Sequence, residues 1–201
     1  MTIGGQYYSI SLPLSGRRSD DPLDVCVVHL SEATVNGLLQ RGYVFLDCPA
    51  DVNPGASLRI RETVLLAGYP GSSTKYDIPR KKVIAKPFIF STSYLPKGLS
   101  IAGFPPVSHI VCRYERRRVS ILGKRHLQTG PLPHGMSGSG IWRVLEGAGN
   151  TLRPLLLGIL TEYHANRSVI ISTRIDVWID IIRQKVDSAM PNPGLKIGII
   201  D

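Results

Sequence analysis

The stretch GMSGSGIW, residues 135–142, joins a turn rich in glycine and serine to an apolar run that is typical of a β-strand. Glycine permits the tight backbone turn that exposes a serine hydroxyl. Backbone N–H groups in such a turn can converge on one developing negative charge. The pattern therefore predicts that Ser137 is exposed just before a strand, and it makes Ser137 a candidate nucleophile. A Gly/Ser β-turn without chemistry is the alternative interpretation.

Short apolar runs separated by turn residues extend from this stretch in both directions and predict an all-β body. The expected strands are residues 24–30, 43–46, 63–70, 82–85, 88–90, 108–113, 119–122, 141–144, 155–160 and 168–172. Many short strands favour a sandwich or a barrel. From Ile175 to Val186 the apolar residues recur at helical spacing instead, so we expect one amphipathic C-terminal helix with Thr173 and Asp176 at its capping positions.

Composition limits the class of protein further. The chain has 201 residues, of which 43% are hydrophobic, enough for a packed core. Lysine and arginine number 24 against 15 acidic residues, and this excess attracts polyanions or acidic substrates in general. The three cysteines have neither disulfide-framework nor metal-ligand spacing. We find no signal peptide and no membrane span, so the sequence as written is expected to be cytoplasmic.

Several ordered segments together resemble the trypsin/chymotrypsin-like serine peptidase family, in particular bacterial members with few disulfides. Asp24 opens an apolar run (DVCVVHL), as the family's triad aspartate does, and Ser137 follows it in the family's order. The other segments that carry the resemblance are VLLAGYP (64–70) for a strand and turn near the end of the first barrel, GMSGSG for the nucleophile loop, LLLGILTEY (155–163) for the strand that pairs with substrate, and ISTRIDVWIDII (171–182) for the C-terminal helix.

The resemblance implies a chymotrypsin-like double β-barrel with a C-terminal helix, the first barrel being incomplete. Residues 1–80 would be the remnant of the N-terminal barrel with the triad aspartate, and 81–104 would be the crossover. Residues 105–188 would form the C-terminal barrel and helix, and 189–201 a tail.

The resemblance also assigns roles to single residues. Ser137 would be the nucleophile and Asp24 the acid of the triad, with the Gly135 and Ser137 amides as the oxyanion hole. The substrate-binding residues would be Pro131, Leu132, His134, Thr161, Glu162 and Tyr163. The pocket-base position, six residues before the serine, holds no acid, so a trypsin-like preference for lysine or arginine is not implied. The expected partner is a peptide or protein substrate, and no cofactor or metal is implied.

The general base is missing from its usual place. In the family the catalytic histidine precedes the aspartate, but all five histidines follow Asp24: His29, His109, His126, His134 and His164. We favour the explanation that Met1 is an internal start or that the reading frame is truncated, the parent protein being an active endopeptidase. The alternative is a catalytically dead domain that binds a protein partner. In either case the chain as written is expected to be nearly inactive on peptides.

A third hypothesis starts from a basic run in the sequence. The run comprises Arg113, Arg116, Arg117, Arg118, Lys124 and Arg125, which could neutralise phosphates. It lacks interleaved stacking aromatics beyond Tyr114, so we favour a solvated hairpin turn and do not expect nucleic acid as a partner.

Overall fold

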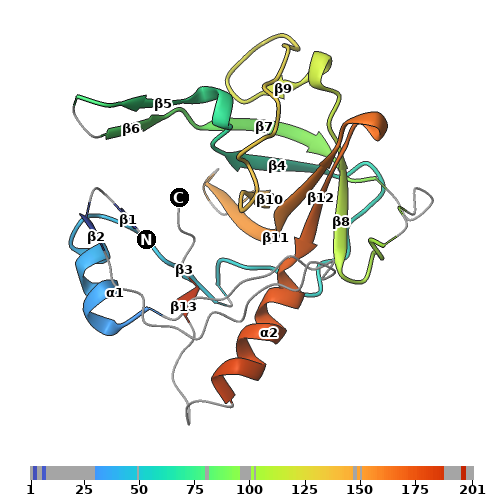
Figure 1. Cartoon of the computed structure of the whole chain (residues 1–201). Coiled ribbons are helices and arrows are strands. Elements are labelled where there is room, and N and C mark those ends of the chain that lie inside the picture. Colours follow the sequence, from blue (N-terminus) through green and yellow to red (C-terminus); the bar gives the residue numbers. More distant parts are fainter. Residues whose placement is uncertain are drawn as a thin grey trace.

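One seven-stranded antiparallel sheet forms the body of the molecule, in the order β8-β12-β11-β10-β4-β7-β9 (Figure 1). The computed structural model describes residues 2–3, 6–7, 30–48, 50–79, 82–95, 101, 103–146, 149, 151–187 and 196–197. The strands of the sheet are β4 (Thr63–Gly68), β7 (Phe88–Ser93), β8 (His109–Arg113), β9 (Ser120–Ile121), β10 (Gly140–Glu146), β11 (Leu152–His164) and β12 (Val169–Arg174).

Shorter elements surround this sheet. Three two-stranded pairs are β1 (Thr2–Ile3) with β2 (Gln6–Tyr7), β3 (Leu46–Asp47) with β13 (Lys196–Ile197), and β5 (Thr74–Asp77) with β6 (Lys82–Ala85). The helices are α1 (Glu32–Leu39) and α2 (Ile175–Asp187), with 3₁₀ turns at Gly71–Ser73, Arg116–Arg118 and Ala165–Arg167. In Figure 1 the β5–β6 hairpin projects away from the sheet, and α2 lies at the end of β11 and β12. Neither described helix is long and apolar enough to cross a membrane.

The sheet curls until its two flanks meet. A bridge pairs Tyr94, just after β7, with Cys112 of β8, and the Leu95 N–H donates to the Val111 carbonyl at 2.9 Å. Because side chains alternate between the two faces of a strand, one face of every strand points into the enclosed core. The largest buried cluster fills this interior and includes Leu66, Phe90, Cys112, Tyr114, Met136, Ile141, Leu157 and Ile170. Burial raises the pKa of the Cys112 thiol to about 12, so this thiol is an inert core group.

The C-terminal helix was predicted from its apolar spacing and is confirmed. Ile175 and Ile179 pack against Leu156 of β11 in a second buried cluster. The Asp176 carboxylate accepts hydrogen bonds from the Gly55 N–H (2.7 Å) and from Arg174 Nε (3.0 Å). Asp176 therefore ties the start of α2 to the end of β12 and to a distant segment of chain, a role beyond the expected cap.

The expected all-β body with a C-terminal helix is confirmed, whereas the double barrel is not shown, since the described residues form one curled sheet. β4 was assigned to the first barrel, but it pairs with β10 on one side and β7 on the other. Residues 63–93 therefore share a sheet with residues 109–174, and the expected boundaries at 80 and 105 do not divide it. An apolar alternating run fits any sheet of the right curvature, so its pattern alone could not select the partner strands.

Two local predictions also need correction. The strand expected over 43–46 is reduced to β3, which begins at Leu46. Helix α1 was not predicted, because only Leu38 of its residues is buried and no apolar stripe marks it. Its N-cap is Ser31, whose Oγ accepts the Thr34 N–H at 3.3 Å, as N-cap serines do.

An ion pair holds the segment before β4 onto β10, and we predict that it stabilises the fold. Arg143 Nε lies 2.6 Å from a Glu62 carboxylate oxygen, and Arg143 Nη2 also donates to the Ser57 carbonyl at 2.9 Å. Both side chains are mostly buried, at 18% and 19% exposed. Removing one partner by Glu62→Gln should lower the free energy of unfolding by about 1.5–3 kcal/mol, the range for hydrogen bonds to charged groups. Urea unfolding at pH 7 measures this difference.

The same pair predicts a pH dependence. Burial alone would raise the pKa of Glu62, but hydrogen bonds from the Arg143 side chain and the Arg59 amide, together with their charges, lower it overall. A folded-state pKa below the unfolded value means that the ionised carboxylate stabilises the fold. The advantage of the wild type over Glu62→Gln is then complete above pH 4.5, the ordinary value, and disappears as pH falls through the folded-state pKa. A difference that stays constant down to strongly acid pH would contradict this assignment.

Candidate functional site

The loop that leads into β10 exposes Ser137 between two anchored residues. Met136 is 1% exposed and packs in the main core, while Ser137 lies at the surface. Gly135 and Gly138 have φ values of +81° and +94°, which residues with a Cβ rarely adopt. A Cβ on Gly135 would also lie 3.0 Å from the Gly71 backbone nitrogen. The glycines on both sides of the serine are therefore required by the backbone conformation of this loop.

Two backbone amides of the loop remain available to a bound group. The His134 carbonyl accepts the Gly71 N–H at 2.7 Å, and the Met136 carbonyl accepts the Ser139 N–H at 3.0 Å. In a trans peptide the N–H points opposite to the C=O. The N–H groups of Gly135 and Ser137 therefore point away from Gly71 and Ser139, and neither has a hydrogen-bond partner within the described part of the chain.

Strand β11 holds the loop from the other side. The Gly138 N–H donates to the Leu160 carbonyl and the Leu160 N–H donates to the Ser139 carbonyl, both at 2.8 Å. Ser137 Oγ lies 3.5 Å from the Thr161 carbonyl, longer than an ordinary O–H···O bond, so the hydroxyl is only weakly engaged.

Beyond Leu160 one edge of β11 is open. β10 pairs with β11 only as far as Ile159, while β12 continues to pair with it through His164. Among the described residues, no strand covers the opposite edge of residues 161–164. A backbone edge of this kind lies beside Ser137 and can accept an extended peptide.

The expected substrate-pocket residues Pro131 and Tyr163 both contact a buried tyrosine. The Tyr114 hydroxyl donates to the Pro131 carbonyl at 2.6 Å, and its ring meets the Tyr163 ring edge-on at 5.6 Å. Tyr114 is 1% exposed, and burial, followed by the neighbouring Tyr163, raises the pKa of its phenol. In the sequence, Tyr114 stood out only as an aromatic residue within the basic run. The one feature that pointed to a buried position was its place directly after an apolar strand.

The remaining expected binding residues are placed as follows. Glu162 pairs with His164, whose Nε2 lies 2.9 Å from a carboxylate oxygen, so its charge is partly engaged by its own strand. Leu132 and His134 are exposed in the loop before Ser137. Asp24, the expected triad acid, and His29 lie outside the described residues.

Among the described residues, no histidine hydrogen-bonds to Ser137. His109 is buried and contacts the Ser108 hydroxyl at 2.9 Å, and His164 is paired with Glu162. His126 is exposed, like His134. The described part of the chain also contains no group of three or more His, Cys, Asp or Glu side chains that could hold a metal ion. The site therefore combines a serine hydroxyl with two free amides and an open strand edge, without a general base in the described part.

No family model and no curated protein matches this chain. Solved structures give three similarities at low identity. A mutant of human heparin binding protein (CAP37) is 14% identical, with 72% of this chain and 52% of that chain covered and a TM-score of 0.39. An atomic-resolution structure of the protein abbreviated HBP is 14% identical, with coverages of 70% and 51% and a TM-score of 0.38. The scabies mite inactivated protease paralogue S-I1 is 13% identical, with coverages of 71% and 53% and a TM-score of 0.35. This chain spans about half the length of these chains.

Proposed function

We propose that the chain belongs to a chymotrypsin-type serine endopeptidase domain in which Ser137 is the nucleophile. One observation carries the proposal: an exposed serine hydroxyl shares a loop with the backbone amides of Gly135 and Ser137, which have no hydrogen-bond partner among the described residues. Backbone donors of this kind stabilise the oxyanion of a tetrahedral intermediate. The ordered resemblance between Asp24 and Ile182 in the sequence supports the same class of reaction.

The proposed reaction proceeds through an acyl-enzyme. The Ser137 Oγ attacks the peptide carbonyl while a base takes its proton, and the carbonyl oxygen becomes an anion held by the two amides. The C–N bond then breaks, and the amine leaves with that proton. Water subsequently releases the acyl group. Asp24 is proposed to orient the imidazole that serves as base, and this imidazole must come from outside the described residues.

The substrate is proposed to lie as an extended strand along the open edge of residues 161–164. Main-chain hydrogen bonds would provide most of its affinity. Pro131 and Tyr163, which would line the substrate pocket, are held in place by the buried Tyr114. Glu162 is already paired with His164, so we propose that the site has no strong preference for basic residues.

The alternative function is a protein-binding module that uses the same open edge without cleavage. It is favoured by one observation, namely that no described histidine contacts Ser137. The two functions differ in covalent chemistry, because only the first one requires Ser137 to become acylated.

Acylation of Ser137 provides the test. We expect the full chain to show almost no peptide hydrolysis, but to acquire an acetyl group on Ser137 when it is incubated with p-nitrophenyl acetate and imidazole. Added imidazole should raise the rate of this acylation at least about 10-fold. This is less than the roughly 10²–10⁴-fold that a positioned base contributes, because dissolved imidazole is not held next to the serine. Intact-mass and peptide mapping by mass spectrometry measure the adduct.

Two variants serve as controls. Ser137→Ala should abolish the mapped adduct. Ser139→Ala keeps the loop backbone and the exposed Ser137 hydroxyl, so it should retain the adduct. Acetylation confined to lysines, or equal in the wild type and Ser137→Ala, would exclude a nucleophilic serine and favour the binding module.

A further inference from the structure

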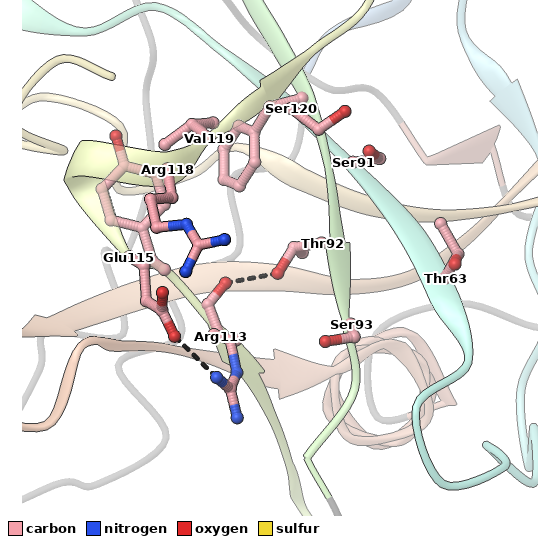
Figure 2. Close-up of a pocket in the computed structure, with 11 residues that line it drawn as sticks. Thr63, Ser91, Thr92, Ser93, Arg113, Glu115, Arg118, Val119 and Ser120 are labelled. Carbon is pink, nitrogen blue, oxygen red and sulfur yellow. Dashed lines mark hydrogen bonds and ion pairs between the residues drawn. The ribbon is translucent and has the colours of Figure 1, made fainter. Parts of the chain in front are cut away.

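A hollow lies between β7, β8 and β9, outside the Ser137 loop. Figure 2 shows its lining, which comes from the start of β4, the end of β7, the end of β8, the 3₁₀ turn and β9. Its volume is about 230 Å³. The residues that line it are Thr63, Phe90, Ser91, Thr92, Ser93, Arg113, Tyr114, Glu115, Arg118, Val119 and Ser120. None of them belongs to residues 131–139 or 161–164, although Tyr114, which lines the hollow, also contacts Pro131 and Tyr163.

The lining is rich in hydroxyl groups. The Thr92 hydroxyl donates to the Arg113 carbonyl. Within the described part of the chain, the hydroxyls of Thr63, Ser91, Ser93 and Ser120 make no hydrogen bond. The pairing of Ser93 with Thr63 and of Ser91 with Ser120 in adjacent strands brings these residues together. The hollow therefore presents several hydroxyl donors to whatever enters it.

The lining also carries an uncompensated positive charge. Arg113 Nη1 lies 2.6 Å from a Glu115 carboxylate oxygen, so these two side chains neutralise each other. Arg118 has no ion-pair or hydrogen-bond partner for its guanidinium among the described residues. Figure 2 shows this guanidinium directed towards Thr92 and the backbone of Arg113, inside the ring of lining residues. Two arginines and one glutamate give the hollow a formal charge of +1.

We propose that this hollow binds the phosphate or sulfate group of a small molecule. A tetrahedral oxyanion accepts hydrogen bonds on every side, which suits the Arg118 guanidinium and the hydroxyl groups that line the same hollow. The volume is below the roughly 300 Å³ at which sites for drug-sized ligands begin and well above the roughly 30 Å³ of one water. The occupant is therefore an ion or a small head group. Phe90 and Tyr114, which are 2% and 1% exposed, form the buried floor of the hollow.

Titration with three probes tests the proposal: inorganic phosphate, phenyl phosphate and uncharged phenol, each followed by calorimetry and by backbone-amide NMR. We expect saturable phosphate binding with a Kd on the order of 1 mM, with shifts at Ser91, Ser93 and Ser120. Arg118→Gln should weaken it at least about 10-fold, which corresponds to about 1.4 kcal/mol. Arg117→Gln removes the same charge from the same 3₁₀ turn but does not line the hollow, and it should leave the Kd within about two-fold of the wild-type value, a change of less than about 0.5 kcal/mol.

Each outcome supports or overturns the site. Tighter binding of phenyl phosphate than of inorganic phosphate identifies an ester as the occupant, and equal binding identifies the free anion. Equal weakening by the two arginine variants would show diffuse surface charge and overturn the site, as would tight binding of phenol or shifts elsewhere. Unchanged amide spectra of Arg118→Gln away from the hollow establish that this variant is folded. Ser137→Ala should not alter phosphate binding, so failure here leaves the proposed peptidase function untouched.

Discussion

Gly68→Ala should lower the free energy of unfolding by about 3 kcal/mol, the upper part of the range for overpacked cores. Gly68 ends β4 directly against the loop that carries Ser137. A Cβ at this position would lie 1.8 Å from the Ser139 Oγ, 2.7 Å from the Ser139 Cβ and 3.3 Å from the Met136 side chain. Rotation of Ser139 could move its hydroxyl, but the Cβ overlap can be relieved only by moving the loop backbone. The same substitution should therefore also slow acylation of Ser137.

A second substitution separates this steric cause from a general weakening of the strand. Ser139→Gly removes the two closest of the atoms that the new methyl would meet, so the double variant Gly68→Ala/Ser139→Gly should recover most of the lost stability. Urea unfolding followed by the fluorescence of Trp142 and Trp178 measures all four proteins of this cycle. If Ser139→Gly fails to rescue Gly68→Ala, the loop is not packed on β4 as described.

Tyr114→Ala should cost about 4 kcal/mol of unfolding free energy, as truncation of buried aromatic side chains does. The ring is 1% exposed and contacts the Phe90 ring at 5.0 Å and the Tyr163 ring at 5.6 Å. Its loss leaves a cavity beneath Pro131 and Tyr163, two residues expected to line the substrate pocket. We therefore expect the open edge of residues 161–164 to loosen together with the core. Chemical denaturation of this variant checks the magnitude.

Tyr114→Phe is the matched control. It keeps the ring contacts and removes only the hydrogen bond to the Pro131 carbonyl, so it should cost about 1 kcal/mol. The pKa of Tyr114 is raised, chiefly by burial, which means that the neutral phenol stabilises the fold. The wild type should therefore lose its advantage over Tyr114→Phe as pH rises above 10.0, the ordinary value for tyrosine. Equal costs for the alanine and phenylalanine variants would contradict the packing role of the ring.

Local chemistry made several features predictable from the sequence alone. Strands β4, β7 and β10 to β12 were expected because alternating apolar residues suit a half-buried pleated strand. The apolar spacing of Ile175, Ile179 and Ile182 predicted α2, and the glycines around Ser137 predicted an exposed turn. Each of these depends on neighbours a few residues away, which the sequence displays directly. The catalytic role of Ser137 and the oxyanion role of Gly135 stay predictions that the acylation experiment tests.

Only the tertiary structure decided which of these elements meet. β4 lies beside β10, although 72 residues separate Gly68 from Gly140 in the chain. Tyr114 contacts Pro131 and Tyr163, and the hollow around Arg118 collects hydroxyls from separate strands. The pattern of an apolar strand is compatible with many partner strands. Which partner it takes depends on the volume and curvature of the core that the strands share. Contacts between distant residues follow from that choice, and for this reason they could not be predicted from local sequence.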